Sequence, residues 1–223
     1  MKSKYFDETL PDLGKHPTLD LNNKLAKNYD HLNLTMERWI SKKRTIFSKI
    51  QGDVLEVGVG TGNNLMYYHP KANIIAFDWS FEMLSQAKMK TRIYELSNIA
   101  EFIIGDIQNL SKIFNLNSFD YVVSSCVFCS VPDPILGLKE IYKVLKSSGR
   151  LIQIEHGISD NRLINIGLNF FEHITPKIYG FHLNRNHLNN LKCSGFRLIY
   201  NYKIDPFGIF RFLVSKKENI YQD

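Results

Sequence analysis

A glycine-rich loop that directly follows an apolar strand is the strongest chemical signal in this sequence. Residues 53–62 read Asp-Val-Leu-Glu-Val-Gly-Val-Gly-Thr-Gly, so Gly58, Gly60 and Gly62 alternate with other residues. Glycine has no Cβ, and such a loop brings bare backbone against a ligand. The spacing disfavours a dinucleotide, which needs Gly-x-Gly-x-x-Gly, because the third glycine comes one residue early. Glu56, at the end of the strand, would also repel a phosphate.

Acidic residues end the next two predicted strands. The strand at 73–77 runs into Asp78, and a carboxylate at that position can accept the ribose hydroxyls of an adenosine held over the first strand. The alternative for Asp78 is a helix N-cap, a role that Ser80 would fill equally well. The following predicted strand, 101–107, contains Gly-Asp at its end, with Asp106 as the acidic residue.

The pattern Glu-x-Gly-x-Gly-x-Gly resembles motif I of class I S-adenosylmethionine-dependent methyltransferases, whose ligand carries an ammonium and a sulfonium instead of phosphates. The resemblance implies that Asp106 lies beside the adenine amino group and that Ile107 covers the ring. Tyr29, in Lys-Asn-Tyr-Asp, resembles the family's tyrosine that reaches the methionine carboxylate, although a packing role is an equal alternative. The implied site for S-adenosyl-L-methionine comprises Tyr29, Glu56, Gly58, Gly60, Thr61, Gly62, Asp78, Trp79, Asp106, Ile107 and Ser124.

The remaining elements predict an α/β fold. We expect a Rossmann-like, seven-stranded, mostly parallel sheet with an antiparallel last strand and helices on both faces. A fourth strand at 119–124 and a helix-to-strand turn at 144–151 follow in the family's order, and Asp133 is the expected N-cap of a helix that begins at Pro134. Strands at 196–202 and 209–215 read as a hairpin. Residues 1–50 are predicted to form an N-terminal helical cap over the cofactor site, and residues 51–217 the methyltransferase domain.

Composition sets further limits. The chain has 223 residues, 44% of them hydrophobic, which suits one α/β domain with a modest appendage. No apolar run approaches the ~20 residues that span a bilayer, and residues 1–8 lack the apolar core of a signal peptide. Three cysteines fit a reducing, cytoplasmic location. Cys126 and Cys129 have no second pair or nearby histidines, so we expect no metal site and assign them to the pocket wall.

Basic residues outnumber acidic ones, with a net charge of +6. The densest group is Lys42, Lys43 and Arg44, with Arg38 one turn earlier, on an amphipathic helix predicted over 34–50. A solvated helix face is the default explanation, and contact with nucleic acid or an anionic membrane surface is the alternative. Nucleic acid is disfavoured because Ser-Ser-Cys-Val follows the fourth strand, where base-amine methyltransferases carry an Asn-Pro-Pro-Tyr type of motif.

Three later motifs narrow the resemblance, which runs from about Lys24 to Ser215. Residues 127–134, 155–157 and 182–185 resemble a branch that includes soluble bacterial phosphatidylethanolamine N-methyltransferases and membrane-associated methyltransferase-like proteins that methylate alkyl thiols. The branch often has Gly-Cys-His where this chain has Gly180-Phe181-His182. The implied acceptor is small or lipid-like, first of all the amine of phosphatidylethanolamine. A quinone or another small metabolite, and a non-catalytic methyltransferase-like partner protein, are the alternatives.

An amine must be neutral to attack a methyl group, so a nearby group has to take or hold its proton. The candidates are His156, His182 and Glu155, each of which could instead be a hydrogen-bonded structural residue. Arg185 could hold a lipid phosphate or simply begin the next helix. Finally, the stretch 162–181 is rich in large apolar side chains. It could wall an acyl-chain pocket, dip into a bilayer surface, or pack in the core.

Overall fold

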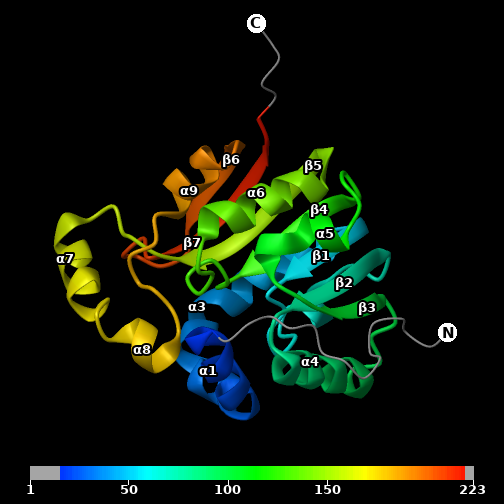
Figure 1. The fold of residues 1–223 in the computed structure, drawn as a ribbon, viewed down its shortest axis with the longest axis horizontal. Helices are drawn as coiled ribbons and strands as arrows, with labels where there is room; N and C mark the ends of the chain where they lie inside the picture. The colour runs from blue at the N-terminus through cyan, green and yellow to red at the C-terminus, as the bar shows by residue number, and fades with distance from the viewer. Residues whose placement is uncertain (1–15, 219–223) are drawn as a thin grey trace, which may run out of the picture.

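The computed structural model describes residues 16–218, so residues 1–15 of the predicted cap lie outside the described range. Within it, seven strands form one sheet in the order β3-β2-β1-β4-β5-β7-β6 (Figure 1). β7 is antiparallel to both of its neighbours, and the other paired strands are parallel, as expected. The strands are β1 (Gly52–Val57), β2 (Ala72–Asp78), β3 (Ile99–Ile104), β4 (Phe119–Ser125), β5 (Leu145–His156), β6 (Phe196–Lys203) and β7 (Phe210–Lys217).

Helices cover both faces of the sheet, which confirms the predicted architecture. Alternation along β1 sends Val54 into one buried cluster and Leu55 into the other. The first cluster is closed by α3 (Leu34–Arg44), η2 (Thr45–Lys49), η3 (Leu65–Tyr67) and α4 (Phe81–Ile93). The second is closed by η4 (Ile107–Asn109), α5 (Leu110–Ile113), α6 (Pro134–Val144) and α9 (His187–Cys193), and Figure 1 shows α5, α6 and α9 in front of the sheet.

The helix α6 forms as the sequence predicts. The Asp133 carboxylate accepts hydrogen bonds from the backbone N–H groups of Ile135 and Leu136, both at 3.0 Å, and Pro134 occupies the first turn. Its apolar stripe, including Leu138 and Ile141, is buried against the sheet. Local capping and tertiary packing therefore agree in this helix.

The segment before β1 is helical and interrupted. It contains α1 (Pro17–Leu25), η1 (Ala26–Asn28), α2 (Tyr29–Leu32), α3 and η2, so the helix predicted over 34–50 divides at Thr45. Arg44 is buried and donates to both Glu37 oxygens and, from Nε at 2.6 Å, to Asn64. The prediction of a solvated basic helix face is therefore wrong for Arg44. Its side chain points inward at the end of α3 and forms an internal ion pair with Glu37.

Two short helices, α7 (Arg162–Phe171) and α8 (Thr175–Tyr179), lie between β5 and α9 and stand to the left of the sheet in Figure 1. Neither contains a buried residue. Core packing, one of the three explanations of this apolar stretch, therefore does not account for its exposed members, whereas Ile164, Leu168 and Phe181 are half-buried. Among the described residues, no helix has the length and apolar character needed to cross a bilayer.

Candidate cofactor and acceptor site

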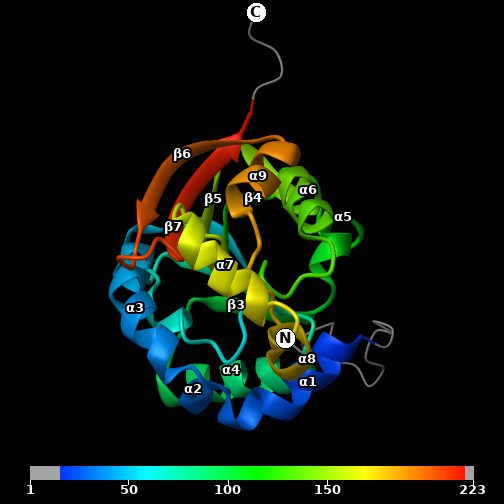
Figure 2. The ribbon, with the colours of Figure 1, turned by 90° about the vertical axis from the view of Figure 1, so that its left-hand side faces the viewer.

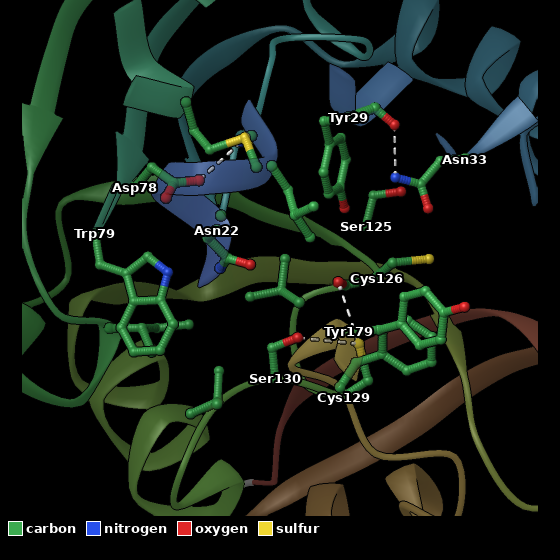
Figure 3. A pocket seen from close by; sticks show the side chains of 18 of the residues that line it. Asn22, Tyr29, Asn33, Asp78, Trp79, Ser125, Cys126, Cys129, Ser130 and Tyr179 are labelled. Atoms are coloured by element: carbon green, nitrogen blue, oxygen red, sulfur yellow. Dashed lines mark hydrogen bonds between the residues drawn. The ribbon is translucent and has the colours of Figure 1, made fainter. Parts of the chain in front are cut away.

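A cavity of about 410 Å³ opens at the carboxyl ends of the parallel strands, where open α/β sheets bind their ligands. Loops after β1, β2, β3, β4 and β5 contribute to its wall, together with the cap helices and α8. Figure 3 shows Asp78 and Trp79 on one side of it and Tyr29, Cys126 and Tyr179 on the other. We call the Asp78 side the cofactor end and the Tyr179 side the acceptor end.

The glycine loop needs glycine at two positions in particular. Gly58 has φ +62°, and a Cβ there would lie 2.4 Å from a methyl carbon of Val127, so only glycine lets the β1 and β4 loops meet. Gly60 has φ +56°, and a Cβ there would meet no atom within 4 Å. The bare backbone at Gly60 therefore faces open space on the cavity wall, as a ligand cradle requires.

Asp78 holds this loop in place from the end of β2. Its Oδ2 accepts the N–H of Gly60 at 2.8 Å, and its Oδ1 accepts the N–H of Ser80 at 2.9 Å. Burial raises the pKa of Asp78 to about 6. Ser80, whose Oγ accepts from Met83, caps α4, so the N-cap explanation of Asp78 does not hold. The predicted contact with ribose hydroxyls stays a prediction.

The other predicted residues at the cofactor end also reach the cavity. Trp79, Asp106 and Ile107 line its wall. Asp106 turns its Oδ1 toward the backbone N–H of Gln108 at 2.9 Å, which fixes the carboxylate at the start of η4. Across residues 16–218, the lining contains two carboxylates and no lysine or arginine. This charge pattern favours a cationic, hydroxyl-bearing ligand over a phosphate-bearing one.

Three of the predicted cofactor residues support the loop from behind and are not part of the main lining. Glu56 is buried, and its Oε1 accepts from Asn64 at 2.8 Å while Oε2 has no hydrogen-bond partner among the described residues. Burial raises the pKa of Glu56 to about 7. Thr61 donates to Asp30 at 2.6 Å, and Gly62 packs against Ala87. Their roles in binding stay predictions.

Asp30 joins the cap to the glycine loop. One carboxylate accepts hydrogen bonds from Thr61, from Asn63 at 2.9 Å and from Lys90 Nζ at 2.5 Å. These donors hold the pKa of Asp30 below its usual value although burial acts in the opposite direction. The neighbouring Tyr29 lines the cavity, and burial raises the pKa of its phenol. Sequence reasoning singled out the tyrosine and missed the aspartate beside it.

At the end of β4, strand alternation decides which serine faces the cavity. Ser124 is fully buried and donates to Glu155 Oε1 at 2.8 Å, whereas its neighbour Ser125 lines the cavity. The structure therefore does not bring the predicted Ser124 to the site, because successive side chains of a strand point to opposite sides.

Glu155 is likewise an internal residue. Besides Ser124, its carboxylate accepts the backbone N–H groups of Val127 at 3.1 Å and Phe128 at 3.3 Å, and burial raises its pKa to about 7. It holds the β4 loop, in which Cys126 has φ +55°. Because these contacts occupy the carboxylate and it does not line the cavity, Glu155 is placed to position this loop and not to meet an acceptor.

The two histidines predicted as catalytic lie in different places. His156 lines the cavity, and its ring lies 5.2 Å from that of Phe181 in an edge-to-face arrangement. Burial, assisted by His187, lowers the pKa of His156 to about 3, so the imidazole is neutral at physiological pH. His182 does not line the cavity. Its Nδ1 pairs with Glu172, and its backbone N–H donates to Cys129 at 2.8 Å.

The cavity wall also contains residues that no motif indicated. Asn22, Asn33 and Met36 come from the cap, and Tyr179 comes from α8. Nothing in the local sequence of the cap helices marks these residues, since they reach the cavity only through the tertiary fold. Within the described part of the chain, no three His, Cys, Asp or Glu side chains gather as a candidate metal site.

The comparisons with known proteins agree with this geometry. Residues 55–153 match the family described as methyltransferase domain. The chain is 29% identical to Methyltransferase OMS1, mitochondrial, of Saccharomyces cerevisiae over 74% of this chain and 38% of that protein. It is 33% identical to a phosphatidylethanolamine N-methyltransferase of Cereibacter sphaeroides over 49% and 53% of the two chains. It is also 33% identical to thiol S-methyltransferase TMT1B of Rattus norvegicus over 52% and 50%.

Solved structures show the same fold at lower identity. One chain of the Haloferax volcanii complex between the Trm112 methyltransferase activator and a methyltransferase superposes with a TM-score of 0.69 at 17% identity, over 89% of this chain and 98% of that one. The [4+2]-cyclase SpnF superposes with a TM-score of 0.61 at 16% identity, over 79% and 81%. The fold alone therefore does not determine the chemistry.

Together, the glycine loop, the two acidic strand ends and the sheet reproduce the fold and the cofactor-site pattern of class I S-adenosylmethionine-dependent methyltransferases. Residues 55–153 match the methyltransferase domain family, and the three curated relatives to which the chain is similar are all named methyltransferases. The Gly60 cradle and the carboxylates in a lining without lysine or arginine fit S-adenosyl-L-methionine, which supplies an electrophilic methyl group when bound. The chain spans between 38% and 53% of the length of these three curated relatives.

Proposed function

We propose that this protein transfers a methyl group from S-adenosyl-L-methionine to a lipid-like acceptor whose reacting group enters the cavity uncharged. The observation that carries the proposal is the acceptor end itself. His156 is neutral there, and the rings of Tyr179 and Phe181 stack at 5.8 Å beside it. Transfer from a sulfonium is an in-line displacement, so orientation and exclusion of water supply most of the catalysis.

The amine of phosphatidylethanolamine is the first acceptor to test. An apolar, uncharged pocket disfavours an ammonium, so burial of the amine at this end promotes the neutral form that can attack. The methylated product is a cation, and aromatic faces such as those of Tyr179 and Phe181 can stabilise it. The Cereibacter sphaeroides relative is named for this reaction, which supports the choice.

His156 is the only one of the three predicted catalytic residues that lines the cavity. With a pKa lowered to about 3, its imidazole stays neutral, and a neutral imidazole has one nitrogen that donates and one that accepts a hydrogen bond. We propose that it orients the acceptor. His156→Asn, which keeps one hydrogen-bonding group, should retain more activity than His156→Ala.

The position of Arg185 argues against a phosphate deep inside the cavity. The Arg185 guanidinium donates to the carbonyl of Val131 at 3.1 Å and does not line the cavity. A phospholipid acceptor would therefore have to keep its phosphate outside the cavity while the amine reaches in.

The same observation favours a second candidate, a demethylated quinone, because a quinone ring needs no cation to hold it. The chain is 28% identical to a demethylmenaquinone methyltransferase of Lactococcus lactis over 67% of this chain and 62% of that protein. Location stays part of the proposal as well: we place the protein in the cytoplasm, at the periphery of a membrane.

One experiment separates these acceptors. The protein is incubated with S-adenosylmethionine labelled on its methyl group, and with vesicles that contain either phosphatidylethanolamine or a demethylated quinone, and the lipids are then separated by chromatography. Label in phosphatidylethanolamine supports the leading proposal, and label in the quinone replaces it with the second. If the protein binds the cofactor and labels neither lipid, a lipid-like acceptor is overturned.

A further inference from the structure

The inner side of α7 combines polar side chains with the half-buried Ile164 and Leu168, and hydrogen bonds attach this side to the protein. Asn165 accepts from the backbone N–H of Ser159 and donates to its carbonyl, both at 2.8 Å. One turn later Asn169 accepts from Asn184 at 3.2 Å. Glu172, just after the helix, pairs with His182 and accepts the N–H of Leu183 at 2.8 Å. Polar contacts thus hold the helix, at three successive levels, against the stretches of chain that precede and follow it in segment 158–186.

Its apolar face points away from the protein. Leu163 is 77% exposed and Phe170 is 69% exposed, and Ile166 and Ile174 continue the same stripe at intervals of three and four residues. Figure 2 shows α7 in front of the sheet, with α8 below it beside α1. A helix at the surface of a water-soluble protein has the reverse orientation, because burial of its apolar side stabilises the fold. Contact with water alone therefore does not explain why the apolar stripe of α7 faces outward.

The charges around the stripe match an anionic surface. Arg162 and Lys177 are exposed, and neither makes an ion pair within residues 16–218. The two carboxylates of the segment are already occupied, since Asp160 pairs with Lys203 and Arg211, and Glu172 pairs with His182. The outward surface therefore combines apolar groups with unpaired cations, as interfacial amphipathic helices do.

The same surface leads into the cavity. Tyr179, at the end of α8, is 53% exposed and also lines the acceptor end. Two residues later Phe181 forms part of the cavity wall beside His156. An apolar molecule that leaves a lipid phase along the apolar side chains of α7 and α8 would reach the acceptor end at Tyr179 and Phe181.

We propose that the outer face of α7 and α8, formed by Leu163, Ile166, Phe170, Phe171, Ile174 and Ile178 with Arg162 and Lys177, inserts into the headgroup region of an anionic bilayer. The functional reason for this insertion rests on the proposed lipid-like acceptor. The insertion itself is inferred from the orientation and the charge of the helix. A lipid surface suits a single convex stripe with flanking cations, since it needs no complementary groove.

The depth of insertion can be measured directly. Phe170→Trp adds a fluorophore to the stripe, and Leu116→Trp adds one at an equally exposed apolar position on another surface. Vesicles of phosphatidylcholine and phosphatidylglycerol with brominated acyl chains, and without phosphatidylethanolamine, are the probe. The emission that Phe170→Trp adds to the parent protein should be quenched, and the emission that Leu116→Trp adds should not. Equal quenching of both, or of neither, overturns the proposal.

Sedimentation with the same vesicles tests the residues. The parent protein should sediment with anionic vesicles and not with pure phosphatidylcholine, and Ile166→Ser with Phe170→Ser should lower the bound fraction at least tenfold. The matched control, Ile93→Ser with Leu116→Ser, removes two exposed apolar side chains elsewhere and should leave binding unchanged. The double variant Arg162→Gln/Lys177→Gln should bind anionic vesicles more weakly than the parent protein, and its binding should depend less on the salt concentration. Equal loss in the control, or self-association through the stripe in sedimentation-velocity runs, refutes docking on lipid.

The two proposals can fail separately. If short-chain phosphatidylethanolamine dissolved below its micellar concentration is methylated while the protein ignores anionic vesicles, the docking surface is wrong and the proposed function stands. If the protein binds vesicles through α7 and methylates no lipid, the docking surface stands and the acceptor is wrong.

Discussion

Two amphipathic helices of this protein, α6 on the sheet and α7 in segment 158–186, turn their apolar faces in opposite directions. In α6 the apolar stripe lies against the sheet, with Leu138 and Ile141 buried. In α7 an equally regular stripe faces outward, and asparagine side chains attach the helix to Ser159 and Asn184 within the same segment. The periodicity of a helix therefore identifies its apolar face and leaves open what covers that face.

The difference follows from where each helix begins. α6 follows β4 and returns along the sheet to β5, so an apolar sheet face is directly beneath it. α7 follows β5 at the edge of the parallel strands and lies to one side of the sheet, not across its face (Figure 1). Segment 158–186 thus forms the acceptor end of the site with little contribution to the core.

The largest expected effect contrasts the two helices directly. Ile141→Ala leaves a cavity in the core and should lower the free energy of unfolding by about 2–5 kcal/mol. Ile166→Ala removes an exposed side chain and should change it by less than about 0.5 kcal/mol. Chemical denaturation of both variants measures the difference. A similar loss in the two variants would show that α7 packs against the body through its apolar face after all.

The next effect concerns cofactor affinity, which should depend on the sheet and not on segment 158–186. Asp78→Ala should weaken binding of S-adenosylhomocysteine by roughly 1.5–3 kcal/mol, the usual range for hydrogen bonds to a charged group. Glu172→Gln, in the segment, should leave that affinity unchanged. Isothermal titration calorimetry of the two variants gives both values. Tighter binding of NAD than of S-adenosylhomocysteine by the parent protein would contradict the whole assignment of the cofactor end.

Buried carboxyl groups of the sheet region should also make the free energy of unfolding depend on pH. Burial raises the pKa of Glu56 and Glu155 to about 7 and of Asp78 to about 6, above their ordinary values of 4.5 and 3.8. Between the unfolded and folded pKa values, these three carboxyl groups bind more protons in the folded protein, so their contribution to stability without cofactor should fall as pH rises from about 4 to about 7. His156 and His187, whose pKa values burial lowers to about 3 and about 4, act in the opposite direction below their ordinary pKa of 6.5. Denaturation curves of the parent and of Glu56→Gln isolate one carboxyl group: the stability of the parent relative to the variant should fall across that range, and a relative stability that stays constant or rises with pH would contradict the prediction.

The smallest expected effect is local. Asn165→Ala removes two hydrogen bonds that attach α7, each worth about 0.5–1.5 kcal/mol in the segment that it holds. Because the segment adds little to the core, the global unfolding transition should stay nearly unchanged while amides of α7 exchange faster with solvent. Hydrogen exchange with mass spectrometry distinguishes the two. A loss of global stability as large as that expected for Ile141→Ala would show that α7 and the core unfold as one unit.

Sequence reasoning succeeded where local chemistry and the fold impose the same constraint. The glycine loop, Asp78 and Asp106 follow directly from strands, so motif order placed them at one edge of the sheet. It failed where a side chain's direction depends on tertiary contacts. Arg44 turned inward to Glu37, and Ser125 took the place expected for Ser124 because the point at which β4 ends sets which residue faces the cavity.

The Asp30 carboxylate has a consequence for ligand exchange. Cap residues form one wall of the cavity, and Asp30 fastens that wall to the glycine loop through Thr61, Asn63 and Lys90. Any exchange of ligand that displaces this wall has to break these hydrogen bonds together. A single half-buried carboxylate, outside the cavity lining, therefore sets how firmly the cap closes over the site.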